Sequence, residues 1–219
     1  MSAAEYKTVQ KSAFDEYIIN KSRFIGYASP VSTEEEALSF IKSIREKHRD
    51  ATHNCYAYII GENAGIMRYS DDGEPSGTAG MPMIEVLKNK GLVNVCVVVT
   101  RYFGGILLGA GGLVRAYSHS TVIAVNAACE VIMKPSVRML CDVPYSLWDK
   151  VNYKLSSMPV ICESVSYSAE VEATLLCESR NTDDVIQTLT QLTDAKAEFL
   201  ITDELYYPWK TENEIGPEQ

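Results

Sequence analysis

The 219-residue sequence lacks any apolar run that approaches the length of a membrane-spanning helix, about 18 residues. Its first residues, MSAAEYKTVQKSAFDEY, contain no hydrophobic segment of the kind that forms a secretory signal. The hydrophobic content of 46% is ordinary for a globular protein. The sequence therefore predicts a cytoplasmic protein without a membrane partner, long enough for one large or two small domains.

The sequence also lacks C-x-x-C pairs, although it contains six cysteines, most of them within apolar runs. This pattern favours buried thiols in a reducing compartment over disulfides or a zinc centre. His48, His53 and Cys55 are too loosely arranged to predict zinc ligands. No cofactor is expected.

Positive charge is scarce in the second half of the chain. Residues 135–219 hold 6 basic residues (Lys and Arg together) against 15 acidic residues (Asp and Glu together), whereas residues 1–134 hold 14 basic and 14 acidic residues. The whole net charge of −9 therefore comes from the second half, which repels phosphate backbones. Any contact with nucleic acid is expected from a local basic patch in the first half.

Glycine, in contrast, is concentrated in RYFGGILLGAGGLVRAY, residues 101–117. The stretch follows Val95–Thr100, a β-branched run typical of a strand buried on both faces. Glycine allows close backbone approach to a ligand, and the first amides of a helix lack internal partners, so together they favour an anion site. Five glycines fall within nine residues: Gly104, Gly105, Gly109, Gly111 and Gly112.

Two arginines bracket these glycines. Arg115 lies on the helical face of Gly111, so its guanidinium is expected over the amides that hold the anion, with Arg101 approaching from the strand end. The alternative is a tight turn whose glycines only let the helix pack closely on the sheet. The spacing fits neither the dinucleotide-binding fingerprint nor a Walker A loop.

A second polar loop, DDGEPSGTAG at residues 71–80, has almost nothing to bury and lies between core elements. Its acids, Asp71, Asp72 and Glu74, are weak candidates for Mg²⁺ ligands. Pairing with Arg101 or Arg115, or capping of the following helix, are alternative roles for the same carboxylates. The remaining candidates for the wall of a site are Ser76, Gly77, Thr78 and His53. No nucleophile signature is present, so no catalytic residue is predicted.

Hydrophobic periodicity predicts an α+β protein in two parts that meet at the natural break Lys134-Pro135: residues 1–134 and 135–219. The expected strands of the first part are Tyr17–Ile19, Ser22–Ser29, Asn54–Ile60, Gly65–Ser70 and Val95–Thr100. The expected helices run from a capping box at Ser32–Glu35 to about Lys47, over Met81–Asn89, and onward from Leu113. The apolar stripe of this last helix is expected at Leu113, Tyr117, Val122, Ile123 and Ala127.

The second part follows the order β-α-β-β-α-β, which is the ferredoxin-like order. Its expected strands are Ser136–Val143, Val160–Tyr167, Glu170–Cys177 and Lys196–Tyr206. The expected helices are Tyr145–Ser157 and one capped by Asn181–Asp184. An acidic tail is expected from Trp209.

Three motifs, HRDATHNCYAY, SDDGEPSGTAGMP and VVVTRYFGGILLGAGGLVRAYS, closely resemble the IMPACT family, and the two-part layout resembles its bacterial YigZ branch. The resemblance implies a first domain like domain IV of elongation factor G, a βαβ-type two-layer sandwich, over residues 1–134. It implies a ferredoxin-like second domain, like domain V of that factor, over residues 135–219. The family pattern falls on His53, Asp71, Asp72, Glu74, Ser76, Gly77, Thr78, Arg101, Tyr102, Gly104, Gly105, Gly109, Gly111, Gly112 and Arg115.

The resemblance favours a non-catalytic protein associated with RNA or the ribosome, and a regulator of translation. RNA phosphate is expected at Arg101, Arg115 and the glycines, with Tyr102 and Phe103 as stacking surfaces. One alternative is an enzyme that binds a phosphate or nucleotide and uses Asp71, Asp72 and Glu74 with Mg²⁺. Another is a protein-interaction module in which the glycine loop is structural.

Overall fold

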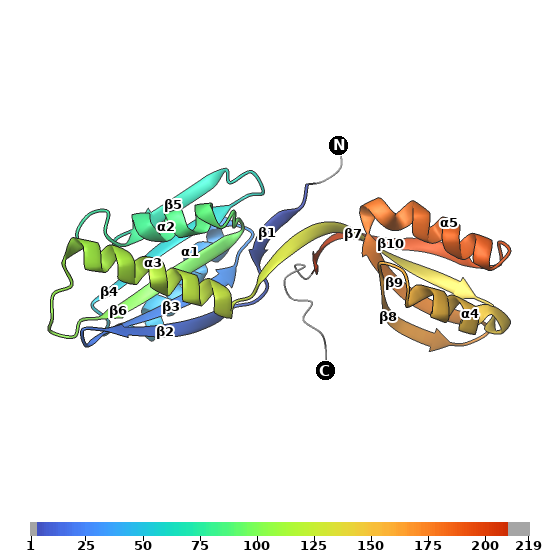
Figure 1. Cartoon of the computed structure of the whole chain (residues 1–219), viewed down its shortest axis with the longest axis horizontal. Coiled ribbons are helices and arrows are strands. Elements are labelled where there is room, and N and C mark those ends of the chain that lie inside the picture. The colour runs from blue at the N-terminus through green and yellow to red at the C-terminus, as the bar shows by residue number, and fades with distance from the viewer. Residues whose placement is uncertain (1–3, 210–219) are drawn as a thin grey trace. The chain divides into compact units, whose positions relative to one another are not determined.

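A computed structural model of the chain describes residues 4–209 and divides into two compact units. The first unit is built mainly from residues 6–132 and the second from residues 133–207 (Figure 1). In each unit, helices pack on an antiparallel sheet. Within residues 4–209, no helix combines the length and the apolar character that crossing a membrane requires.

The first unit is organised around β6 (Val95–Tyr102), the middle strand of a five-stranded sheet. Residues 95–101 of this strand are all buried, as the β-branched run predicted. The sheet order is β2-β3-β6-β4-β5, and neighbouring strands are antiparallel. The other strands are β2 (Ala13–Ile19), β3 (Ser22–Pro30), β4 (His53–Ile60) and β5 (Ile66–Ser70).

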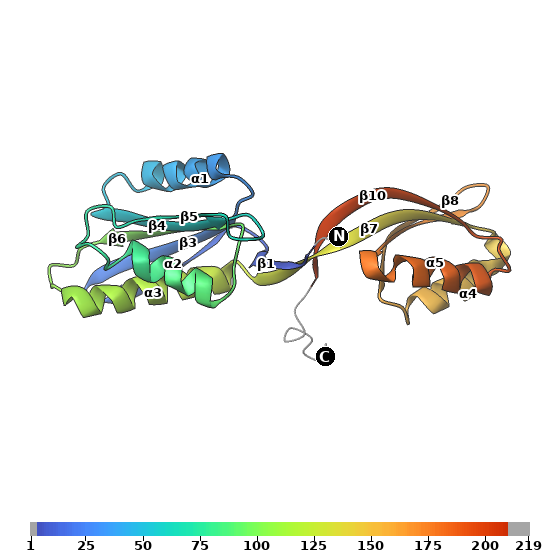
Figure 2. The same cartoon turned by 90° about the horizontal axis from the view of Figure 1, so that it is seen from above.

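Helices cover both faces of this sheet, so the expected two-layer sandwich is wrong for the first unit. Helix α1 (Glu34–Lys47) lies on one face, whereas α2 (Gly80–Asn89) and α3 (Gly109–Ala127) lie on the other (Figure 2). Alternate residues of β6 enter separate cores: Cys96 and Val98 pack with α1, and Val97 with α2 and α3. Because β6 is apolar on both faces, each face requires a covering layer.

Local signals set several of these boundaries. Thr33 caps α1 by accepting a hydrogen bond from the Glu36 amide at 3.2 Å, and the Glu36 carboxylate accepts one from the Ser32 amide at 2.6 Å. The cap therefore lies one residue after the predicted box Ser32–Glu35: Thr33 is the N-cap, and the Glu36 carboxylate binds the amide of Ser32, the residue before it. A short strand that the sequence did not suggest, β1 (Tyr6–Val9), places Val9 in the core shared with α2 and α3.

The second unit has the predicted order β-α-β-β-α-β. Its strands pair in the order β8-β9-β7-β10, and its two helices bury Trp148, Val151 and Leu189 in one core. The elements are β7 (Glu130–Val143), α4 (Tyr145–Leu155), β8 (Val160–Tyr167), β9 (Val171–Glu178), the short 3-10 helix η1 (Ser179–Asn181), α5 (Thr182–Leu192) and β10 (Glu198–Trp209).

The two units divide between Ile132 and Met133, close to the expected boundary at Lys134-Pro135. Strand β7 nevertheless continues through Lys134 and Pro135, so the secondary structure is not interrupted there. Pairing of β7 with β9 begins at Ser136, so Pro135 precedes this ladder and its missing N–H is not needed there. Trp209 is the last residue of β10, and the rest of the predicted tail lies outside the described residues.

Candidate functional site

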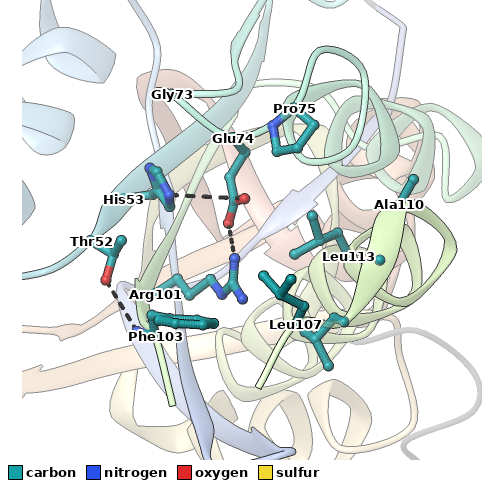
Figure 3. A pocket seen from close by; sticks show the side chains of 12 residues that line it. Thr52, His53, Gly73, Glu74, Pro75, Arg101, Phe103, Leu107, Ala110 and Leu113 are labelled. Carbon is teal, nitrogen blue, oxygen red and sulfur yellow. Dashed lines mark hydrogen bonds and ion pairs between the residues drawn. The ribbon is translucent and has the colours of Figure 1, made fainter. Parts of the chain in front are cut away.

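A pocket of about 380 Å³ lies where β6 ends, β4 begins and α3 begins. Figure 3 shows Glu74 between His53 and Arg101, with leucine side chains on the opposite wall. The pocket therefore joins the acidic loop to the glycine-rich stretch, two segments that the sequence marked separately. Its lining residues are Thr52, His53, Gly73, Glu74, Pro75, Arg101, Phe103, Leu107, Leu108, Gly109, Ala110 and Leu113.

The floor of the pocket is a buried ion pair. Arg101 and Glu74 are 5% and 8% exposed, and Nη1 of Arg101 lies 2.6 Å from Oε1 of Glu74. The Tyr117 hydroxyl donates a hydrogen bond to the same oxygen at 2.8 Å. Pairing of Glu74 with Arg101 is one of the alternatives that the sequence left open. The pair neutralises the positive charge of Arg101 within the protein.

The Arg101 guanidinium is also enclosed by aromatic rings. Its carbon lies 5.3 Å from the centroid of Phe24 and 5.5 Å from that of Phe103, within the range of cation–π attraction. Its Nε, however, is buried and has no hydrogen-bond partner in residues 4–209. One donor of the guanidinium is thus left unsatisfied beside the pocket.

His53 presents an acceptor to the same pocket. Its Nδ1 lies 2.8 Å from the carbonyl oxygen of Asp72. Because a carbonyl oxygen only accepts, Nδ1 carries the hydrogen, and Nε2 of the neutral ring is an acceptor. Nε2 lies 3.9 Å from Oε2 of Glu74.

The two remaining acids of the loop stabilise the backbone. The Asp71 carboxylate accepts hydrogen bonds from the amides of Gly77 and Gly80 at 2.8 Å and of Ala79 at 3.1 Å, and so caps the start of α2. The Asp72 carboxylate binds Arg45 at 2.6 Å and the Asn54 amide at 2.7 Å. Across residues 4–209, no three His, Cys, Asp or Glu residues are grouped to hold a metal ion.

The five glycines of this stretch differ in whether the structure requires glycine at their positions, and why. A Cβ on Gly104 would lie 2.0 Å from the backbone of Lys21, so this position requires close packing. Gly105 and Gly109 have φ of +82° and +68°, in the left-handed region that favours glycine. A Cβ on Gly112 would lie 3.0 Å from Leu108, whereas one on Gly111 would meet nothing within 4 Å. The packing alternative therefore accounts for Gly104 but not for Gly111.

Helix α3 begins at Gly109, four residues before the apolar pattern that the sequence showed. Its N-cap, Leu108, supplies no side-chain hydrogen bond, so the first amides of the helix lack a cap at the edge of the pocket. The predicted apolar stripe is confirmed at Leu113 and Tyr117 but is wrong beyond them, because Val122, Ile123 and Ala127 are only half-buried. The buried face consists of Leu113, Ala116, Tyr117, Ser120, Thr121, Ala124 and Val125.

The structure places only one of the two arginines in the pocket. Arg115 is exposed, is absent from the lining, and has no hydrogen bond or ion pair within residues 4–209. Tyr102 points to the α1 side, where its hydroxyl lies 2.9 Å from Nδ1 of His48. Phe103, the other predicted stacking residue, lines the pocket and is 46% exposed.

The hydroxyl and thiol groups near the pocket are poorly suited to nucleophilic attack. Thr78 is buried and donates to the Pro75 carbonyl at 2.6 Å, while Ser76 is exposed outside the lining. Burial raises the pKa of Cys55 to about 12, so its thiol stays protonated at neutral pH. Burial also raises the pKa of the Tyr117 hydroxyl, which hydrogen-bonds to Glu74 and to Cys55.

Sequence reasoning missed Tyr117 and most of the apolar wall as parts of the site. Tyr117 was assigned only to the core of the helix, yet its hydroxyl holds Glu74. A tyrosine on a buried helix face needs a polar partner, and this requirement was the available signal. No sequence pattern predicted that Leu107 and Leu108 line the pocket, because their positions depend on the residue at which α3 begins.

These features define a class: an α+β protein with two antiparallel sheets and a pocket where the glycine-rich and acidic loops of the first unit meet. The Impact N-terminal domain matches residues 20–125, and the domain of unknown function DUF1949 matches residues 141–196. The chain is 44% identical to "IMPACT family member YvyE" of Bacillus subtilis over 96% of both chains. The chain therefore belongs to the IMPACT family and is a YvyE/YigZ-like bacterial member.

Two other similarities agree with this assignment. "IMPACT family member YigZ" of Escherichia coli is 48% identical over 101 residues, which cover 45% of this chain and 50% of that protein. A solved structure, "Crystal structure of an hypothetical protein", is 28% identical with a TM-score of 0.59, covering 93% of this chain and 98% of the other. The similarity thus extends through both units.

Proposed function

We propose that the chain is a non-catalytic RNA-binding protein that associates with the ribosome and regulates translation, and that its first unit binds an RNA phosphate at the start of α3. The observation that carries the proposal is the uncapped N-terminus of α3 at the edge of a pocket that also holds a buried arginine donor. Free amides at a helix start attract anions.

The surroundings of this helix start support RNA over a small free anion. Gly111 leaves open space above the backbone, and Arg115 follows it by about one helical turn as an exposed cation. Phe103 offers an exposed ring beside the same pocket. Together these groups suit single-stranded RNA, because its phosphates can bind to the cations and backbone amides and its bases can stack on the aromatic ring.

The Mg²⁺-dependent alternative has weaker support, because the carboxylates that it requires are directed elsewhere. Asp71 caps α2, Asp72 binds Arg45, and one oxygen of Glu74 binds Arg101. These groups do not converge on one point of the pocket.

A charge placed at the helix start tests the proposal. In Gly111→Asp, the new carboxylate lies in the first turn of α3, where it stabilises the helix but competes with phosphate. We expect weaker binding of a fluorescent single-stranded RNA by anisotropy, with stability retained. Gly111→Ser is the matched neutral control. Equal affinity of the aspartate and serine variants would refute the site.

Arg115→Ala is the second test, because loss of one phosphate contact lowers affinity and reduces the salt slope by about 1. Lys42→Ala removes an exposed charge from α1 and serves as the control. In cell lysate, the unmodified protein is expected to sediment with ribosomal particles and to be released by salt. Sedimentation apart from the particles at low salt would count against the ribosomal partner.

We also propose the finer fold assignments that the resemblance implies. The element order and the sheet order β8-β9-β7-β10 support a ferredoxin-like second domain, residues 135–219, like domain V of elongation factor G. The first domain, residues 1–134, is proposed to resemble domain IV of that factor. All six cysteines are free thiols, which supports a cytoplasmic location.

A further inference from the structure

The pocket contains two adjacent acceptors that face the same space. Nε2 of His53 and Oε2 of Glu74 are 3.9 Å apart, and neither receives a hydrogen bond from another residue within 4–209. In the neutral ring, the Asp72 carbonyl holds the hydrogen of His53 on Nδ1 and leaves Nε2 as the acceptor, while Arg101 and Tyr117 bind the other oxygen of Glu74. A ligand that satisfies both atoms must present two neighbouring donors.

The charges around these acceptors favour a neutral donor group over an ammonium ion. The guanidinium of Arg101 lies on the far side of Glu74, 2.6 Å from its first oxygen, and the positive end of α3 lies at the pocket edge. An incoming cation would meet both positive charges, whereas a neutral group with N–H donors would not.

The apolar lining of the pocket favours a ring with apolar faces. Phe103, Leu107 and Leu113 line the pocket with apolar surface, and Figure 3 shows these leucines across from Arg101. The volume of about 380 Å³ falls within the range of small-molecule sites, roughly 300–1,000 Å³. An aromatic ring such as Phe103 accepts a nucleobase by stacking.

Among the common RNA bases, guanine has two adjacent donors, N1–H and the N2 amino group, on its Watson–Crick edge. Adenine and cytosine place an acceptor beside their amino group, and uracil has a single N–H between two carbonyl groups. An acceptor directed at His53 or Glu74 would leave a buried polar group unpaired.

We propose that the pocket selects an unstacked guanine base of single-stranded RNA, which donates to Nε2 of His53 and Oε2 of Glu74 and stacks on Phe103. The inference rests on the proposed RNA binding and deepens it from phosphate contact to base recognition.

The test uses the unmodified protein and four uridine-based heptamers of single-stranded RNA. Their central nucleotide is guanosine, inosine, adenosine or uridine, and affinities are measured by anisotropy at one salt concentration. We expect guanosine to bind about tenfold more tightly than adenosine or uridine, as one bidentate base contact allows. Inosine lacks the N2 amino group and is expected to lose most of this preference.

His53→Ala is the matched variant, since it removes one acceptor and leaves the Arg101–Glu74 pair in place. Within the variant, the guanosine heptamer should bind no more tightly than the all-uridine heptamer. Folding of the variant is checked by protection of the buried Cys55 thiol from labelling. A retained guanosine preference in folded His53→Ala would overturn the assignment.

The outcomes separate this inference from the proposed function. Equal binding of all four heptamers overturns guanine selection and leaves RNA binding intact. Absence of binding by every heptamer overturns the proposed RNA binding. Guanosine 5′-monophosphate is tested as a second ligand. If it binds and no heptamer does, the pocket binds guanine from a free nucleotide, and the proposal that the guanine belongs to RNA is wrong.

Discussion

Removal of the Glu74 carboxylate tests the structural account of the pocket floor most directly. In Glu74→Ala, the 5%-exposed Arg101 loses its counter-ion and the Tyr117 hydroxyl loses its acceptor. Breaking a buried ion pair from one side costs about 3–5 kcal/mol. Because the pocket admits water beside Arg101, we expect a loss near 3 kcal/mol in the free energy of unfolding of the first unit, a large share of a typical stability of about 5–15 kcal/mol.

The assay must report on one unit at a time, because a chain of two units need not unfold in a single transition. Cysteine labelling in increasing urea, read by mass spectrometry, provides this resolution. Cys55 and Cys96 are buried in the first unit, and Cys141 and Cys177 in the second. Glu74→Ala is expected to shift labelling of the first pair to lower urea and to leave the second pair unchanged, which serves as an internal control.

A double-mutant cycle separates the ion pair from other effects of the substitution. Arg101→Met and Glu74→Leu each leave one charge unpaired, whereas the double variant leaves none. The double variant is therefore expected to lose clearly less stability than the sum of the single variants. If Glu74→Ala costs less than about 1 kcal/mol, or if the losses simply add, the pair is not desolvated and this description of the pocket floor is wrong.

Three further predictions follow from single residues. Gly104→Ala is expected to destabilise the first unit by more than the ~1 kcal/mol typical of point mutants, since its Cβ would lie 2.0 Å from the Lys21 backbone; an unchanged urea midpoint for Cys96 labelling would contradict this. Burial, with help from the nearby Lys47 and Arg23 charges, lowers the pKa of His48, so the unfolded chain binds the proton more readily. The contribution of neutral His48 to the free energy of unfolding is therefore fully present above the ordinary histidine pKa of about 6.5 and is lost as the pH drops below it. His48→Gln should weaken this pH dependence in urea titrations monitored by circular dichroism. In the native protein, a thiol reagent should label exposed Cys162 well before the four buried cysteines; early labelling of Cys96 would indicate a looser core.

Much of the fold follows from patterns that are local in the sequence. The β-branched run at Val95–Thr100 predicted a buried strand, which is confirmed. The Ser-Thr-Glu-Glu pattern predicted the start of a helix, which begins as expected but is capped by Thr33 and Glu36 instead of Ser32 and Glu35. The layer count was wrong because it depends on which elements pack on each face of β6, which is a property of the tertiary structure. The two units divide close to Pro135, but the strand continues through this residue, because a proline interrupts a strand only where its missing N–H is needed for pairing.

The site was predictable in its segments but not in its geometry. The acidic loop and the glycine stretch were both marked by composition, and the structure brings Glu74 and Arg101 together from positions 27 residues apart. The position of Arg115 depends on the rotation of α3 about its axis. That rotation is set by Leu113 and Tyr117 at the core, not by the glycines, so Arg115 is exposed rather than lying in the pocket.

The backbone of the acidic loop explains how three nearby carboxylates take three different roles. Asp72 and Gly73 have φ of +45° and +90°, so the chain reverses between Asp71 and Glu74. This reversal directs Asp71 to the start of α2 and turns Glu74 into the pocket. The Asp72 carbonyl in the reversed segment also fixes the hydrogen of His53 on Nδ1. The same turn therefore sets both acceptors that face the pocket, and the proposed guanine site predicts that a change in the backbone of this turn alters base preference before it alters phosphate binding at α3.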